Sequence, residues 1–307
     1  MLFDRKTLII PDNTVFEEHV IVTDGDVIVS DGAKVGFGIK TEGRIFVGEH
    51  ALVDGSLDAK GDIHVDLFSE IKGDVSSERN VYLGERVVVN GKLSVKGDLD
   101  VGDNVDIKEG FKVKGWINLR GPIPFIIYIF IYLLQLLKLG RSEEIERILS
   151  EFEKNEGEPI PVSPVFLFIP TNAVVGIQRS KTDADVVVGA NCKILGNFEG
   201  AGNICVDDDS SIHGSLSSKG TITLGGKVEI HGSLFSQGDV YLGEECVVHG
   251  GVTAERLFLP RNSMVEGTIF AEKGVTFSAA KKKGLDEKLE RFEVGADVVD
   301  EVKHMLE

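Results

Sequence analysis

Cysteine is scarce in this chain of 307 residues, and the scarcity excludes two kinds of architecture. Cys192, Cys205 and Cys246 are odd in number and form no CxxC pair, so neither a disulfide framework nor a zinc ribbon is expected. The opening MLFDRKTLII also lacks an apolar run long enough for a signal peptide. These absences predict a cytoplasmic protein in a reducing compartment, with the inner face of the cell membrane as a further candidate location.

Basic residues are also few, because 33 lysines and arginines stand against 50 aspartates and glutamates, for a formal net charge of −17. So acidic a chain is not expected to bind the phosphates of nucleic acid nonspecifically. The P-loop pattern GxxxxGK[ST] does not occur, and no convincing Ser/His/Asp set is present. We therefore predict no bound nucleotide, cofactor or metal ion, and no nucleic-acid partner.

Glycine, in contrast, is abundant, and its spacing reveals an internal repeat. Two series of glycines recur every 18 residues: Gly55, Gly73 and Gly91, and then Gly196, Gly214, Gly232 and Gly250. A unit of 17 residues then leads to a last partial unit at Gly267. Proline removes a donor from a strand ladder, and of the 8 prolines only Pro260 lies inside the regular units.

The columns of the aligned units predict the fold. Position 3 of the unit is apolar throughout: Leu57, Val75, Leu93, Phe198, Leu216 and Leu234. Positions 9 and 11 are apolar too, and polar residues alternate with them, which is typical of half-buried strands. Glycines at positions 1, 7 and 12 mark three bends. Three short strands per unit predict an all-β solenoid, a triangular parallel β-helix with 18 residues per coil, whose roughly ten coils would form a rod on the order of 50 Å long.

Residues 121–170 interrupt this pattern with six prolines and the apolar run FIIYIFIYLLQLLKL at 125–139. We expect a helical hairpin, whose second, amphipathic helix over 143–155 can be N-capped by Ser142. At 1.5 Å per residue the first helix would span about 22 Å, too short for a clean membrane span of roughly 30 Å. It is therefore predicted to anchor the protein to a membrane surface or to a partner, or to pack on the rod itself. The candidate contact residues are Phe125, Ile126, Tyr128, Ile129, Phe130, Tyr132, Leu133, Leu136 and Leu137.

The sequence thus predicts five segments. They are an N-terminal arm (1–19), a first β-helix block (20–120), the helical insertion (121–170), a second block (171–280) and a charged C-terminal tail with helical character (281–307). The two blocks can form one broken column or two rods side by side, and the sequence leaves both arrangements open.

Three histidines fall at position 18 of successive units and are expected to form a vertical ladder: His213, His231 and His249. At a spacing of about 4.8 Å, three imidazoles can share a metal ion. The corresponding positions of the first block hold other polar residues: Asp54, Lys72 and Asn90. We therefore interpret the ladder as a solvent-facing column of the repeat without a metal ion.

The ends of a solenoid are candidate contact surfaces, because they present unpaired backbone groups above an open core. Phe277 occupies position 11 of the last partial unit, where other units carry valine or leucine, and either plugs the end or contacts another subunit. Phe235 and Phe270 occupy position 4, two coils apart, and are expected to face outward as a lateral contact.

Units such as GSLSSKGTITLGGKVEIHGSLFSQGDVYLGEECVVHG resemble those of the bactofilins, a family of polymer-forming cytoskeletal proteins. The resemblance covers roughly residues 36–115 and 190–278. It implies a right-handed β-helix that assembles end to end into filaments without nucleotide, often at the cytoplasmic face of a membrane. The chain departs from the family pattern in having two blocks around an insertion, which leaves both a filament and a closed oligomer open.

An enzymatic alternative comes from other parallel β-helices, the hexapeptide acyltransferases and the gamma-class carbonic anhydrases. Those proteins repeat an aliphatic-Gly pair at nearly every hexapeptide. Here such a pair occurs once per 18 residues, as in Leu83-Gly84 and Leu242-Gly243. We therefore predict a non-enzymatic scaffold that associates with itself. A metal ion bound at the histidine ladder would favour the enzyme.

Overall fold

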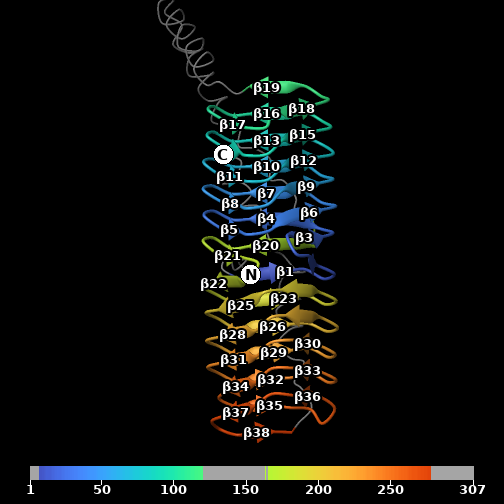
Figure 1. Ribbon diagram of the computed structural model, residues 1–307, viewed down its shortest axis with the longest axis vertical. Helices are drawn as coiled ribbons and strands as arrows, with labels where there is room; N and C mark the ends of the chain where they lie inside the picture. Colours follow the sequence, from blue (N-terminus) through green and yellow to red (C-terminus); the bar gives the residue numbers. More distant parts are fainter. Residues whose placement is uncertain (1–6, 120–162, 164, 278–307) are drawn as a thin grey trace, which may run out of the picture.

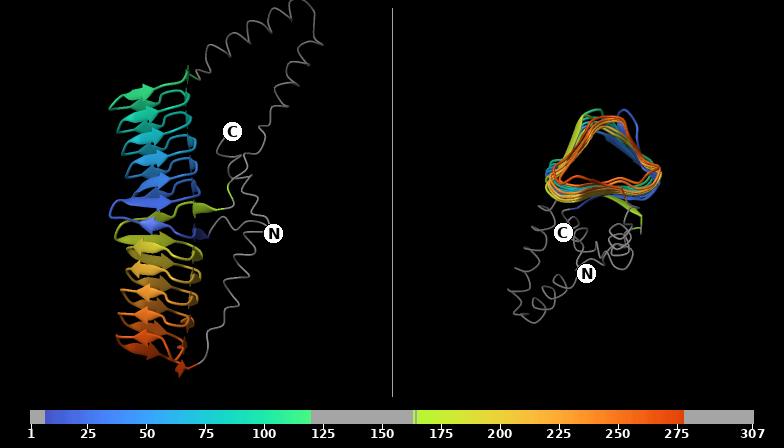
Figure 2. Two further views of the ribbon diagram at one scale, coloured as in Figure 1. Left: turned by 90° about the vertical axis from the view of Figure 1, so that its right-hand side faces the viewer. Right: turned by 90° about the horizontal axis from the view of Figure 1, so that it is seen from below.

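The structure is a computed structural model, and it describes residues 7–119, 163 and 165–277. Within these residues every regular element is a short β-strand, and the strands form three sheets that wrap around one core. Figure 1 shows a single tall column, and the end-on view in Figure 2 shows its triangular cross-section. The predicted triangular solenoid is confirmed, and of the two arrangements left open the structure has the single column.

Each sheet is one face of the triangle, and its strands follow one another along the column. Sheet A contains, in spatial order, β19 (Ile117–Leu119), β16 (Leu99–Val101), β13 (Val81–Leu83), β10 (Ile63–Val65), β7 (Ile45–Val47), β4 (Asp26–Val29), β20 (Phe166–Ile169), β1 (Leu8–Ile10), β23 (Val186–Val188), β26 (Ile204–Val206), β29 (Ile222–Leu224), β32 (Val240–Tyr241), β35 (Leu257–Phe258) and β38 (Val275–Thr276). Sheet B contains β18 (Phe111–Val113), β15 (Leu93–Val95), β12 (Val75–Ser77), β9 (Leu57–Ala59), β6 (Gly38–Thr41), β3 (Val20–Thr23), β2 (Val15–Phe16), β24 (Lys193–Leu195), β27 (Ser211–His213), β30 (Glu229–Ile230), β33 (Val247–Val248) and β36 (Met264–Val265). Sheet C contains β17 (Asp106–Ile107), β14 (Val88–Val89), β11 (Glu70–Ile71), β8 (Leu52–Val53), β5 (Lys34–Val35), β21 (Val174–Val175), β22 (Arg179–Thr182), β25 (Asn197–Gly200), β28 (Leu216–Ser218), β31 (Leu234–Ser236), β34 (Val252–Ala254) and β37 (Ile269–Ala271).

The register along the column follows the sequence repeat. In sheet B, Val75 lies opposite Leu57 on one side and opposite Leu93 on the other, and all three side chains are fully buried. Each coil thus places its inward side chains on those of the coil before it. At about 25 cal/mol per Å² of buried apolar surface, this stacking is the main source of stability, because one coil cannot enclose a core alone.

The two solenoid halves meet in the middle of the column at their N-terminal ends. There β1 pairs in parallel with β23 of the second half, and β20 pairs in parallel with β4 of the first half. The first strand of each half therefore pairs in parallel with the other half and extends the sheet of that other half. The two exchanged strands run antiparallel to each other through the pair Ile9 and Phe168, and Figure 1 shows them between β4 and β23.

This junction has internal two-fold pseudosymmetry. Val15 pairs with Val22 across an antiparallel bend in the first half, and Val174 pairs with Lys181 in the second. Corresponding residues of the halves are 159 positions apart, as Val15 and Val174 are. The sequence retains identities at the same offset: Pro11 and Pro170, Asn13 and Asn172, Thr23 and Thr182, and Asp26 and Asp185. The chain is thus a duplicated unit that folds like a head-to-head dimer with exchanged first strands.

The junction changes two predicted boundaries. The expected arm at 1–19 contains β1 and β2, which are part of the column, and the expected insertion at 121–170 ends in β20. These strands precede the first full repeat of their halves, so the 18-residue spacing does not mark them. The helical hairpin otherwise falls outside the described residues, as does the C-terminal tail at 281–307.

In most coils one corner residue has a left-handed backbone conformation, and this residue is rarely glycine. Ten residues other than glycine have φ between 54° and 60°: Asn13, His50, Phe68, Arg86, Asn104, Asn172, Asn191, Asp209, Lys227 and Glu245. They share position 14 of the coil, a bend that the glycine pattern did not predict. The repeat glycines have another role. A Cβ atom added to Gly73 would lie 2.5 Å from the Ser56 nitrogen of the previous coil, so glycine there permits close approach of backbones.

Replacing Gly73 by alanine is therefore expected to destabilise the fold by about 1–3 kcal/mol, because the methyl group has no room between two coils. Denaturant or thermal unfolding measures the effect. Gly226→Ala is the matched control, since the nearest heavy atom to its added Cβ would lie 3.5 Å away. Equal losses of stability in the two variants would contradict the close-approach role of Gly73.

Candidate functional sites: rod ends, outer apolar face and a histidine–glutamate cluster

Both ends of the column present strands with a free edge. β17, β18 and β19 are terminal at one end of the three sheets, and β36, β37 and β38 are terminal at the other. Among the strands that the structure describes, none pairs with their outer edges. Such edges carry N–H and C=O groups that can pair with another chain.

In the described residues, the inward side chains of both end coils are exposed. Leu99 of an inner coil is 1% exposed, whereas Ile117, stacked on it in the last coil of the first half, is 44% exposed. We define the first-half end by the inward positions of that coil: Phe111, Ile117 and Leu119, with exposed fractions of 56%, 44% and 77%. We define the second-half end by the corresponding positions: Ile269, Val275 and Phe277, with exposed fractions of 38%, 38% and 67%. Large apolar side chains that are exposed next to one another are typical of an interaction site.

The structure places the predicted contact residues in two locations. Phe277 lies at the second-half end, and its 67% exposure does not fit the alternative in which it plugs the core. Phe235 and Phe270 lie on sheet C, each opposite Thr253 of the strand between them, and are 49% and 59% exposed. They face outward as expected. Both ends of the solenoid were predicted as contact surfaces, but no residue of the first-half end was named, although Phe111 continues the apolar column at position 3.

A further apolar surface covers the outside of sheet A in the middle of the column, and we call it the outer apolar face. On β7 the core contains Ile45 and Val47, so Phe46 between them points outward, yet it is fully buried. Six other buried side chains outside the core cluster belong to this face: Ile9, Ile28, Phe166, Phe168, Val187 and Cys205. The expectation of half-buried strands is wrong here, because these strands are buried on both faces, as their unbroken apolar sequences require.

Next to this face, three rings stack on adjacent strands of sheet A. His64 lies between Phe46 and Tyr82, with ring centroids 5.0 Å and 4.4 Å away. Its Nδ1 atom is enclosed without a hydrogen-bond partner. Burial lowers the pKa of His64 to about 4, because the surroundings disfavour the imidazolium ion.

The position of His64 predicts a pH dependence of stability. Its pKa is about 4 in the fold and 6.5 where the imidazole is in water, so the unfolded chain binds the extra proton between these values. The contribution of neutral His64 to the free energy of unfolding is fully present above pH 6.5 and is lost as the pH falls towards 4. The loss is on the order of 3 kcal/mol. His64→Phe should flatten the unfolding free energy over this window, whereas the same change at the exposed His19 should not. If both variants keep the wild-type profile, His64 does not cause it.

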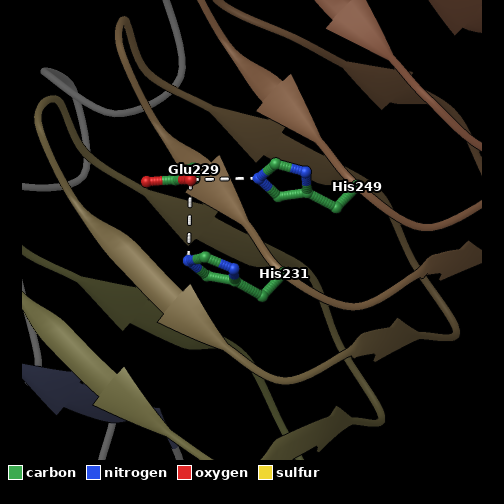
Figure 3. A group of neighbouring side chains, drawn as sticks. All are labelled: Glu229, His231 and His249. Atoms are coloured by element: carbon green, nitrogen blue, oxygen red, sulfur yellow. Dashed lines mark hydrogen bonds and ion pairs between the residues drawn. The ribbon is translucent and has the colours of Figure 1, made fainter.

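The third candidate site is a cluster on the outside of sheet B, which we call the histidine–glutamate cluster: Glu229, His231 and His249 (Figure 3). One carboxylate oxygen of Glu229 lies 3.0 Å from Nε2 of His249 and 3.6 Å from Nε2 of His231. The other ring nitrogen of His249, Nδ1, lies 2.8 Å from a carboxylate oxygen of Glu266. Their side chains are about one-third to one-half exposed.

Within this cluster, the hydrogen bonds between the carboxylates and His249 favour the charged form of each partner. The hydrogen bond to His249 lowers the pKa of Glu229, and the hydrogen bonds to Glu229 and Glu266 raise the pKa of His249. The predicted ladder is also present, since His231 stacks on His249 with centroids 5.0 Å apart and His213 meets His231 edge-on at 4.1 Å. The histidine column did not indicate Glu229, because Glu229 lies at position 16 of its unit. Glu266 continues that column, since it follows His249 one coil later and precedes Gly267 as the histidines precede their glycines, but it was not named.

The predicted lipid or partner residues at 125–139 lie outside the described residues. In the part of the chain that the structure describes, no helix is long and apolar enough to cross a membrane.

No protein-family model, no curated protein and no solved structure matches the chain.

Proposed function

We propose that the protein is a structural scaffold that associates with further copies of itself through the two ends of its column. The observation that supports this is the exposure of inward core positions at both ends, where Leu119 and Phe277 are 77% and 67% exposed. A second copy offers the same free strand edges and the same open core. Stacking the two would continue the ladders and cover the apolar side chains, as inner coils do for one another.

The topology fixes the relative strand directions at any contact between two column ends. Because the halves join at their N-terminal ends, both outer ends of the column are the C-terminal ends of a half. Contact between two copies therefore joins strands that run in opposite directions, as β1 and β20 do at the junction. The chain itself thus provides an example of the antiparallel contact that we propose between copies.

The finer features of the proposal rest on the resemblance to bactofilins. They are a right-handed coil, assembly without nucleotide, a cytoplasmic location and the lack of an enzymatic activity. The hexapeptide-type acyltransferase or carbonic anhydrase remains the alternative. Conversion of an acyl donor or of carbon dioxide by purified protein would support that alternative, whereas assembly without added ligand supports the scaffold.

Charged substitutions at the ends test the association. Leu119→Asp blocks the first-half end and Phe277→Asp the second, because a buried carboxylate without a partner is costly to dehydrate. We expect wild-type protein to form large assemblies in analytical ultracentrifugation and electron microscopy, and the double variant to be monomeric.

The single variants identify the pairing. If like ends meet, each single variant stops at dimers, and if unlike ends meet, each is monomeric. Thr253→Asp, on the flank between Phe235 and Phe270, is the matched control for lateral contact and should assemble as wild type does. Assemblies that persist in the double variant, or a wild-type protein that stays monomeric at high concentration, would contradict the proposal.

We further propose that residues 125–139 attach the scaffold to a membrane surface. The segment is apolar on all sides, with Gln135 and Lys138 as its only strongly polar members, so it requires an apolar environment. The net charge of −17 disfavours attraction to anionic lipid. Binding should therefore be hydrophobic and insensitive to salt.

Flotation with neutral phosphatidylcholine vesicles tests this attachment. We expect the full-length chain to float at low and high salt, and Phe130→Lys with Leu133→Lys to remain unbound, whereas Ser150→Lys in the following segment should float. A wild-type chain that does not float would contradict lipid binding and would favour a protein surface, such as the outer apolar face, as the site for this segment.

A further inference from the structure

The histidine–glutamate cluster has no role in end-to-end association, because it lies on the flank of the column. Its ligand atoms nevertheless converge. Glu229, His231 and His249 each offer a ligand atom within 4.8 Å of those of the other two, and Figure 3 shows both rings directed at the carboxylate. Two imidazoles and one carboxylate are a common ligand set for zinc when a fourth position is left open.

The spacing suits an ion of that size. Tetrahedral coordination with bonds of about 2.0–2.1 Å places neighbouring ligand atoms about 3.3 Å apart. Glu229 lies 3.0 Å from His249 and 3.6 Å from His231, one distance on either side of this value. Both distances from the carboxylate are therefore compatible with an ion shared by Glu229 and the two histidines.

An independent feature is the carboxylate behind His249. Histidines that bind metal ions usually donate their second ring N–H to a carboxylate, which fixes the tautomer and the ring orientation. Nδ1 of His249 lies 2.8 Å from Glu266 in this way, while Nε2 faces the centre of the cluster. Glu266 thus orients His249 and does not itself belong to the three converging ligands.

The backbone holds the cluster rigidly. Glu229 begins β30, His231 directly follows it, and His249 directly follows β33, the next strand of sheet B. β30 and β33 are paired in parallel, with Glu229 opposite Val247. Two of the ligands are therefore fixed by one coil and the third by the neighbouring coil.

We propose that Glu229, His231 and His249 bind a divalent transition-metal ion of the zinc class, with Glu266 as the positioning residue and a water molecule in the fourth position. The ion would replace the proton that His249 shares with Glu229. Nε2 then coordinates the ion through its lone pair, and this one proton leaves to the solvent. No bond to carbon forms or breaks, and we propose a binding site on the flank of the scaffold. A bound ion would count for the enzymatic alternative only together with conversion of carbon dioxide or an acyl donor.

Zinc titration of the full-length chain without a polyhistidine tag tests the proposal, with calorimetry for affinity and thermal unfolding for linked stability. We expect one ion per chain and an unfolding temperature that rises with zinc. Glu229→Gln, His231→Gln and His249→Gln should each weaken binding at least tenfold, and Glu266→Gln by about tenfold. Cobalt, added as a spectroscopic probe, should show tetrahedral coordination in the wild-type chain.

His213→Gln is the matched control, because His213 is the next histidine of the same ladder but is not among the three converging ligands. It should bind zinc as tightly as the wild type does. The variants face outward, and unfolding without metal checks that each has the wild-type fold. Wild-type protein without saturable binding, or ligand variants that bind as well as His213→Gln, would overturn the proposal. Either result leaves the end-to-end association unaffected, because that association is measured without metal.

Discussion

The structure depends on one constraint, which is that each coil can bury its inward side chains only on those of a neighbouring coil. Val75 between Leu57 and Leu93 is the simplest example, because it is enclosed above and below by residues of its own column. The same constraint explains the repeat glycines, which let two backbones approach where a side chain would separate them. It also requires that a coil without a neighbour leaves its core open to solvent.

Each half has two ends, so the column has four places where a coil needs a neighbour to cover its core. The two N-terminal ends are covered by the exchange of β1 and β20, because each half is continued by a strand from the other. Phe16 fills the core at this junction, with its ring 5.3 Å from Phe37 of the first half and 6.2 Å from Phe198 of the second. The C-terminal ends have no such exchange among the described residues. The contrast between closed inner ends and open outer ends is the physical basis of the proposed self-association.

The sequence was sufficient for the parts of the fold that repeat. The column at position 3, the coil of 18 residues and the outward ladder of His213, His231 and His249 all follow from spacing alone. The exchanged strands could not be predicted in this way, because Leu8–Ile10 and Phe166–Ile169 precede the repeats and their partners are set by topology. The histidine–glutamate cluster could be predicted only in part: the histidines and Glu266 share one column of the repeat, whereas Glu229 reaches the cluster from position 16 of its coil. The outer apolar face was missed because period-two alternation was extended to strands that are apolar on both sides.

The central claim is that the halves form one column with the two C-terminal ends far apart. Spin labels on Lys112→Cys and Glu272→Cys, exposed positions in the last coils of the two halves, measure this directly, since Cys192, Cys205 and Cys246 are buried. Sheet A has 14 strands from one end to the other, so at about 4.8 Å per strand the monomeric double end variant should give a distance of about 60 Å by pulsed electron resonance. A distance below about 30 Å would place the halves side by side and would contradict the account.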